Sequence, residues 1–148
     1  MLYRGVNKIV DQGNNGRLLP RGNKSEVTAL YDGKFKHDGK LKYSPCQSNT
    51  ARAHHIESGL YDGCGVSTTR DEKLAVFFAT FGYIEDGYVY VIDESLLKGA
   101  DVSYYEFSDP LYPEEKEVTL IHNECKSIPN RVIVDKYAVN IDGSRVLE

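Results

Sequence analysis

Short apolar runs separated by glycine, proline and acidic residues recur along the chain and predict a fold rich in short strands. The clearest run is residues 88–92, Tyr-Val-Tyr-Val-Ile, which is bounded by Gly87 and Asp93 and predicts a buried strand. The same kind of pattern predicts further strands at residues 3–6, 66–69, 131–134 and 137–141.

Helical patterns occur in two segments. Thr69 and Glu72 form a capping box, and the apolar stripe that follows predicts a helix packed into the core through Leu74, Phe77, Phe78 and Phe81. Asn23 and Glu26 predict an earlier helix that ends before Gly33. Turns, loops and irregular chain are predicted at residues 11–22, 34–53, 95–99 and 103–113.

An unusual acidic pattern lies in residues 112–121. After Pro113 the alternation of polar and apolar residues predicts a strand that carries Glu115, Glu117 and Thr119 on one face. Two carboxylates in such positions repel each other and cost stability, so we interpret them as a candidate active site. The alternative interpretation is an exposed edge strand whose acidic start keeps it soluble.

Composition favours a soluble, β-rich globular domain. The 148 residues include 41% hydrophobic and 27% charged residues, 11 tyrosines and 13 glycines. We expect one domain over residues 1–146, with 147–148 as a tag remnant. The net charge of -4 gives no broad attraction to nucleic acids. Because a membrane-length apolar run and a secretory signal are both missing, we expect no membrane partner and a cytoplasmic site of action.

The cysteine and histidine residues do not predict a metal site. Cys46, Cys64 and Cys125 are odd in number and far apart, so we expect free thiols rather than disulfides or a zinc site. His54 and His55 point to opposite faces if the chain is extended, and no third ligand is suitably spaced. A structural or substrate-contact role is favoured for both histidines.

Three short motifs, taken in order, resemble the signature of a known enzyme family. Arg4, the Ser-Thr-Thr of residues 67–69 and the Glu-Lys-Glu of residues 115–117 resemble the arginine, Ser-Thr-Ser and Glu-x-Glu motifs of mono-ADP-ribosyltransferase toxins. The chain is most similar to the cholera-toxin and pierisin branch. Thr69 replaces the last serine and keeps its hydroxyl group. Further similarities occur, in the same order, at residues 19–22, 62–63, 88–92, 113 and 127–129.

This resemblance implies an α+β fold, a split β-sandwich with few short helices that binds NAD between two sheets and needs no metal. Glu117 would stabilise the ribosyl cation formed as nicotinamide leaves, and Ser67 would hold that carboxylate ionised and oriented. Arg4 would bind the NAD phosphates, while Gly5 would leave room for the nicotinamide amide. The implied NAD contacts are Arg4, Gly5, Ser67, Thr68, Thr69, Glu117 and one or both of His54 and His55.

The acceptor is less defined than the NAD site. A glutamate at position 115 is associated in the family with transfer to arginine, and its carboxylate would bind the guanidinium and take up its proton. Phe107 and Tyr112, in the loop of residues 105–112, are candidates for acceptor recognition, although loop packing explains them equally well.

Several alternative functions compete with transfer to a protein. Nucleic acid could be the acceptor, as in pierisin-like enzymes, and water as acceptor would make the protein an NAD glycohydrolase. A binding module that has lost activity is a further possibility. The favoured interpretation is a monomeric bacterial toxin or effector that modifies a macromolecule in the cytoplasm. Such a protein would endanger its producer, so we expect an immunity protein or delivery machinery.

Overall fold

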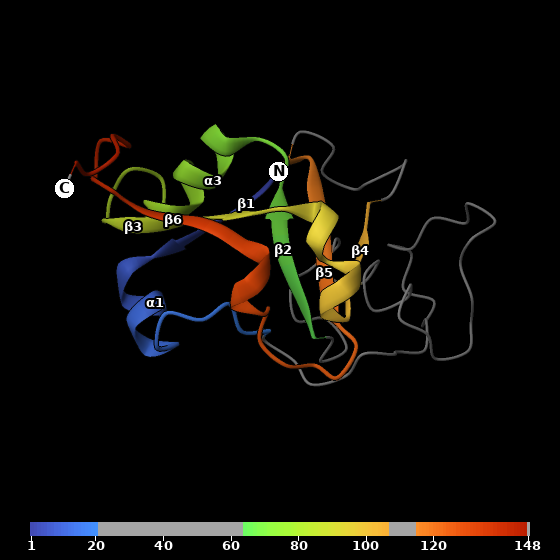
Figure 1. Ribbon diagram of the computed structural model, residues 1–148. Helices are drawn as coiled ribbons and strands as arrows, with labels where there is room; N and C mark the ends of the chain where they lie inside the picture. Colours follow the sequence, from blue (N-terminus) through green and yellow to red (C-terminus); the bar gives the residue numbers. More distant parts are fainter. Residues whose placement is uncertain (21–63, 107–114, 148) are drawn as a thin grey trace, which may run out of the picture.

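The computed structural model describes residues 1–20, 64–106 and 115–147, and within them six antiparallel strands follow the order β4-β5-β2-β1-β3-β6 (Figure 1). The strands are β1 (Leu2–Asn7), β2 (Gly65–Thr69), β3 (Gly87–Ile92), β4 (Val102–Tyr105), β5 (Glu117–His122) and β6 (Ile133–Val139). The helices are α1 (Lys8–Gly13), α3 (Glu72–Ala79) and the 3-10 turns η2 (Glu94–Leu96), η3 (Lys98–Ala100) and η5 (Asn130–Val132). None of the helices in these ranges is long and apolar enough to cross a bilayer.

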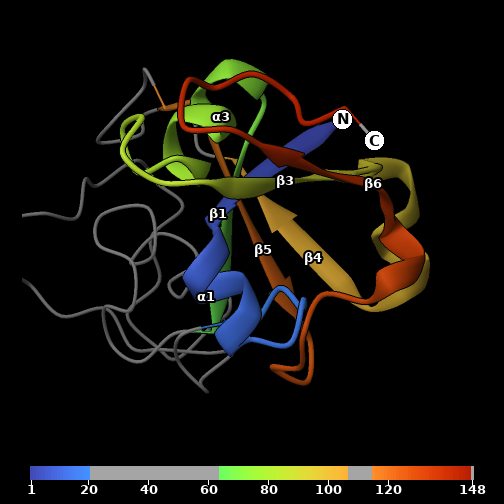
Figure 2. The same ribbon diagram turned by 90° about the vertical axis from the view of Figure 1, so that its left-hand side faces the viewer.

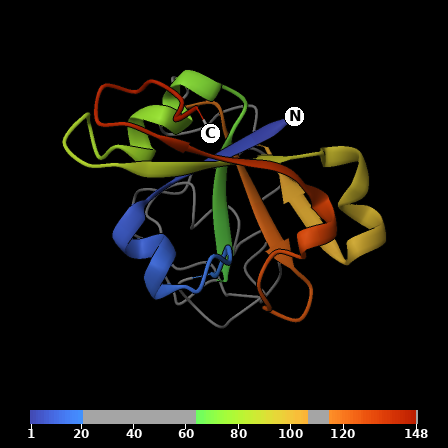
Figure 3. The same cartoon turned by 60° about the vertical axis from the view of Figure 1, so that its left-hand side comes forward.

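The sheet is split into two halves. β1 and β2 pair through Tyr3 and Thr69 alone, and β2 then turns away, so β2, β4 and β5 run steeply across β1, β3 and β6 (Figure 3). The main core fills the angle between the halves, with Leu2 and Tyr90 from one half packed against Val66 and Leu120 of the other. This arrangement confirms the predicted α+β split β-sandwich.

Helix α3 covers the outer side of β1 and β3 (Figure 2). Its buried residues are Ala75 and Ala79, and a Cβ atom added to Gly5 would lie 1.9 Å from the Ala75 carbonyl oxygen. A Cβ atom on Gly87 would lie 2.0 Å from the Ala79 carbonyl oxygen. The helix therefore packs through small residues because two glycines let its backbone approach the sheet.

The predicted packing face of α3 was wrong. Phe77, Phe78 and Phe81 are 44%, 41% and 66% exposed, so the aromatic stripe does not lie in the core. The helix also begins later than the capping box predicts, because Asp71 is its N-cap and accepts a hydrogen bond from the Lys73 amide. Thr69 remains at the end of β2.

Helix α1 occupies part of the segment predicted as a loop. Asn7 caps it by accepting a hydrogen bond from the Val10 amide at 2.8 Å. The buried Asp11 accepts hydrogen bonds from the Tyr90 hydroxyl and from Lys136 Nζ, which ties the helix to β3 and β6. These long-range contacts outweigh the weak helix propensity of the local sequence.

Two strand assignments also differ from the predicted ones. β4 lies at the start of the predicted 103–113 loop, where it pairs with β5 at the sheet edge. The two predicted closing strands form one continuous strand, β6, which follows the η5 turn. The predicted helix at residues 23–33 and the irregular segment at 34–53 lie outside the described residues.

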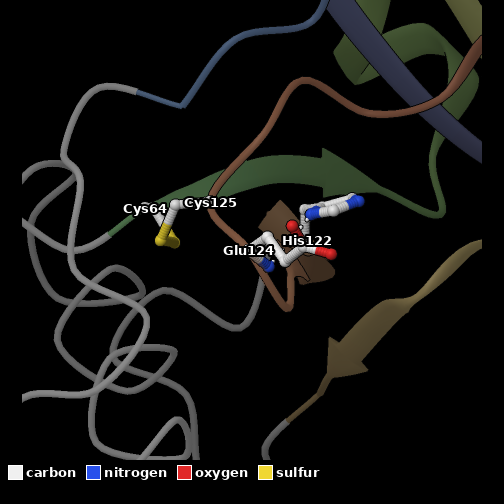
Figure 4. The surroundings of a disulfide bond; sticks show 4 residues. All are labelled: Cys64, His122, Glu124 and Cys125. Atoms are coloured by element: carbon white, nitrogen blue, oxygen red, sulfur yellow. Dashed lines mark hydrogen bonds between the residues drawn. A yellow bond between two sulfur atoms is a disulfide. The ribbon is translucent and has the colours of Figure 1, made fainter.

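Cys64 and Cys125 form a disulfide, so the prediction that they are free thiols was wrong (Figure 4). Cys64 precedes β2, and a tight turn after the neighbouring β5 returns Cys125 to it, with the Cys125 amide donating to the His122 carbonyl at 2.8 Å. Their Cα atoms are 5.5 Å apart, a usual distance for a disulfide. The pairing depends on strand neighbours, which cysteine spacing does not reveal.

Removing this disulfide should lower the free energy of unfolding. The bridge joins residues 61 positions apart, and the entropy of closing such a loop in the unfolded chain corresponds to about 4 kcal/mol. Urea unfolding of the oxidised protein and of the double variant Cys64→Ser/Cys125→Ser measures the difference. A reductant should weaken the wild type but leave the double variant unchanged. Equal midpoints for the two oxidised proteins would contradict the prediction.

Candidate active site

The candidate site lies where β2 and β5 run side by side. In their antiparallel register Ser67 is opposite Thr119, and Thr69 is opposite Glu117, the first residue of β5. Ser67 is therefore a diagonal neighbour of Glu117 on the same face of the sheet. The strand pairing thus brings together two motifs that are 50 residues apart in the sequence.

Two hydroxyl groups converge on the carboxylate of Glu117. Ser67 Oγ donates to Glu117 Oε2 at 3.3 Å, and Thr119 Oγ1 donates to the same oxygen at 3.1 Å. The contact between Ser67 and Glu117 is the one that the sequence motifs predict. The strand alternation predicts that Thr119 shares a face with Glu117, but no sequence motif indicates that its hydroxyl group contacts this carboxylate.

Burial raises the pKa of Glu117 to about 7. The negative charge of Glu115 also raises this pKa, while the hydrogen bonds from Thr119 and Ser67 and the positive charge of Arg4 lower it. The carboxyl group of Glu117 is thus balanced between its neutral and ionised forms near neutral pH. A perturbed carboxyl group of this kind is typical of an active site.

Arg4 connects the first motif to the other two. It lies on β1, and its Nη1 donates to the backbone carbonyl of Ser67 at 3.3 Å across the junction of the two half-sheets. The guanidinium lies close enough to Glu117 to stabilise its ionised form. The structure therefore brings Arg4, Ser67 and Glu117 together, as the ordered motifs predict.

The other hydroxyl groups of the Ser-Thr-Thr motif hold strand β5 and the residues before it. Thr68 donates to the Val118 carbonyl at 2.7 Å, and Thr69 donates to the Glu115 carbonyl at 2.7 Å. Both threonine side chains are buried. Gly5 faces the backbone of α3, as described above. NAD contacts by Gly5, Thr68 and Thr69 stay predictions beside these structural roles.

The two glutamates do not share a strand, which corrects the alternation predicted from the sequence. β5 begins at Glu117, and the preceding Lys116 has a left-handed backbone with φ of 46°. Glu115 therefore lies in the approach to the strand, where Thr69 holds its carbonyl. Its charge still acts on Glu117.

Arg70 supports this region, and no sequence motif indicated it. Its Nε donates to both carboxylate oxygens of Glu106, at 3.1 and 2.9 Å, and its Nη1 donates to Glu94 at 3.1 Å. Its backbone amide donates to the Lys116 carbonyl at 3.2 Å. Arg70 thus contacts the chain both after β4 and before β5.

Four predicted site residues, His54, His55, Phe107 and Tyr112, lie outside the described residues. Within residues 1–20, 64–106 and 115–147, no cluster of three or more His, Cys, Asp or Glu side chains could hold a metal ion.

Solved structures of heat-labile enterotoxin share this fold. A mutant described as having a flexible active-site loop in its A subunit is 19% identical, with a TM-score of 0.54 over 100% of this chain and 71% of the toxin chain. A mutant of a buried residue in the E. coli toxin is 21% identical, with a TM-score of 0.54 over 100% of this chain and 73% of that one. The fold is therefore that of the ADP-ribosyltransferases.

A comparison with protein-family models identifies the family within the ADP-ribosyltransferase fold. The family model NarE, which describes an ADP-ribosyltransferase family, matches residues 1–120. The chain belongs to the NarE family and is an NAD-dependent ADP-ribosyltransferase. The comparison with curated proteins gave no match. The predicted enzyme class is confirmed, while the cholera-toxin and pierisin branch stays a prediction.

Proposed function

We propose that this protein transfers one ADP-ribose unit from NAD to the guanidinium group of a protein arginine. The observation that supports this most directly is the Glu117 carboxylate, which is held by Ser67 and Thr119, with Arg4 and Glu115 close enough to act on its charge. In this proposal the Glu117 carboxylate stabilises the positive charge on the ribose, and the Glu115 carboxylate binds the acceptor guanidinium.

In the first part of the reaction, cleavage of NAD, the site must stabilise the positive charge that develops on the ribose. Cleavage of the bond between nicotinamide and ribose releases a neutral pyridine, so the leaving group needs no proton. Positive charge develops on the ribose, and the carboxylate of Glu117, which is half-buried, stabilises it when ionised. Arg4 presents a planar fork of N–H donors that suits a phosphate oxygen. These residues fit the substrate that the family uses.

Glu115 would act in the second part of the reaction, the attack of the acceptor arginine on the ribose. An arginine guanidinium is protonated and a poor nucleophile, so the incoming nitrogen must lose a proton as its bond to the ribose carbon forms. A carboxylate just before β5 can bind the guanidinium and accept that proton. The products are ADP-ribosylated arginine, nicotinamide and the released proton.

The test uses NAD labelled in its adenylate portion together with a cell lysate. Label is expected on material that protease degrades and nuclease does not, and a small alkylguanidine should accept it directly. Nuclease-sensitive label would instead indicate a nucleic-acid acceptor. Free ADP-ribose as the sole product would indicate a glycohydrolase.

Glu115→Gln should separate transfer from NAD cleavage. Transfer to the alkylguanidine is expected to fall by about 10²-fold, as for the loss of a general base. Nicotinamide release into water should persist, because removing the charge of Glu115 favours ionisation of Glu117. Chromatography of labelled alkylguanidine and free ADP-ribose measures both rates. An equal loss of both activities would contradict a role confined to the acceptor.

The biological setting that we propose is that of a bacterial toxin or effector in the cholera-toxin and pierisin branch. It would act as a monomer on a cytoplasmic target, and a cognate immunity protein would protect the producer. The motif order and the enterotoxin-like fold support this setting.

A further inference from the structure

Thr119 approaches the carboxylate of Glu117 from within the sheet. Its hydroxyl group donates to Oε2 at 3.1 Å, a shorter bond than the 3.3 Å of Ser67, and its side chain is fully buried. We infer that Thr119 is a positioning residue of the transferase, whose hydroxyl group orients the Glu117 carboxylate and keeps it ionised for the reaction. This inference rests on the proposed function, because it assigns a role in that reaction.

The strand ladder determines where the Thr119 hydroxyl lies. Thr119 is two residues beyond Glu117 on β5, so both side chains leave the same face. It is directly opposite Ser67 on β2 and Tyr105 on β4. Directly opposed residues have Cβ atoms about 5 Å apart. Ser67 and Thr119 therefore form a pair of hydroxyl groups beside the carboxylate, and the sheet fixes the spacing of the pair.

The direction of these hydrogen bonds favours the ionised carboxylate. An ionised carboxylate accepts hydrogen bonds and donates none, so both hydroxyl groups must donate to it. Two donors on one oxygen also restrict rotation about the terminal torsion of Glu117, which is otherwise broad. Thr119 thereby contributes to both charge and orientation without touching the substrate.

The charges around Glu117 make this contribution important. Burial and the nearby Glu115 oppose ionisation, while Arg4 on β1 favours it. Among the contacts that lower the pKa of Glu117, the hydrogen bond from Thr119 has the largest effect, ahead of those of Ser67 and Arg4. Tyr105 is the titratable neighbour of Thr119 on β4. Loss of the Thr119 hydroxyl would therefore remove the largest contribution that lowers the pKa of Glu117, while burial and Glu115 would still raise it.

The test compares the pH dependence of Thr119→Val with that of the wild type. The kcat/KM for nicotinamide release reports ionisation in the free enzyme and is measured from about pH 5 to about pH 9.5. The wild-type value should rise with pH through a midpoint of about 7. The variant midpoint should lie about one pH unit higher, which lowers kcat/KM at neutral pH about fivefold. At the alkaline end most of this loss should disappear, and KM for NAD should change less than about twofold.

Two variants control for the loss of a buried hydroxyl. Thr119→Ser keeps the donor and should restore the wild-type midpoint. Thr80→Val removes another fully buried hydroxyl, which donates to the Val76 carbonyl at 3.0 Å in α3, and should leave the midpoint unchanged. If Thr119→Val does not fold, Thr119→Ala compared with Thr119→Ser provides the same contrast.

A second measurement is independent of turnover. Carbon NMR of the Glu117 carboxyl group, assigned by its absence in Glu117→Gln, gives its titration without NAD. The midpoint should again be higher in Thr119→Val. A variant whose rate profile and carboxyl titration both coincide with those of an active wild type overturns the inference. A wild type that releases no nicotinamide refutes the proposed function instead, and the NMR titration then decides whether Thr119 controls the ionisation of Glu117.

Discussion

Replacing Glu117 with glutamine is expected to lower the rate of nicotinamide release by about 10²-fold or more. Glutamine has nearly the same shape and can still accept hydrogen bonds from Ser67 and Thr119, so the sheet should remain intact. It carries no negative charge to stabilise the ribosyl cation. Most of the loss should therefore appear in kcat rather than in KM for NAD, as measured by steady-state nicotinamide release.

The matched control is Glu124→Gln. Glu124 lies just beyond the other end of β5, and its side chain is 64% exposed and pairs with Lys126 at the surface. Its neutralisation should leave the rate within about twofold of the wild type, because exposed ion pairs contribute little. A folded Glu117→Gln protein with near-normal NAD turnover would refute the assignment of Glu117. Thermal unfolding of each variant verifies that it is folded.

Gly5→Ala is expected to cost about 3 kcal/mol of stability, although it adds only a methyl group. The new Cβ atom would lie 1.9 Å from the Ala75 carbonyl oxygen and 2.6 Å from the Ala79 amide nitrogen. Both atoms belong to the backbone, so no side-chain rotation can relieve the clash. α3 must move away from β1, and the buried contacts between them are then lost.

Urea unfolding measures this effect, with Gly13→Ala as the control. A Cβ atom on Gly13 meets nothing within 4 Å, and this residue lies in α1. Its replacement should leave stability unchanged or raise it by at most about 1 kcal/mol, since alanine favours the helix. If Gly5→Ala unfolds at the same urea concentration as the wild type, close packing of α3 on β1 is not what requires the glycine.

The sequence motifs could predict that certain residues come together because each has a distinctive chemical type in a fixed order. Arg4, Ser67 and Glu117 lie together in the structure, and the β2–β5 register explains why Ser67 meets Glu117, while their roles in the reaction stay predictions. Thr119 was harder to identify, because a threonine in a strand is ordinary. Its role depends on which residue lies opposite it, and one sequence does not contain that information.

The packing of α3 shows why other predictions failed. Hydrophobic periodicity favours Phe77 and Phe81 as the buried face, whereas the structure buries Ala75 and Ala79. The deciding factors are Gly5 and Gly87, on two strands of the sheet, which allow the helix backbone to approach closely. The disulfide escaped prediction for a related reason, because its cysteines become neighbours only through the pairing of β2 with β5.

The split sheet also bears on how the protein folds. Leu2 pairs with Ile92, and Thr69 pairs with Glu117, so the chain must close long loops before either contact forms. Topologies dominated by such distant pairs fold in milliseconds to seconds rather than microseconds. Until β5 joins β2, Glu117 is an ordinary hydrated carboxylate. The unfolded chain therefore contains every sequence motif of the enzyme, but the environment of Glu117 forms only when the strands pair.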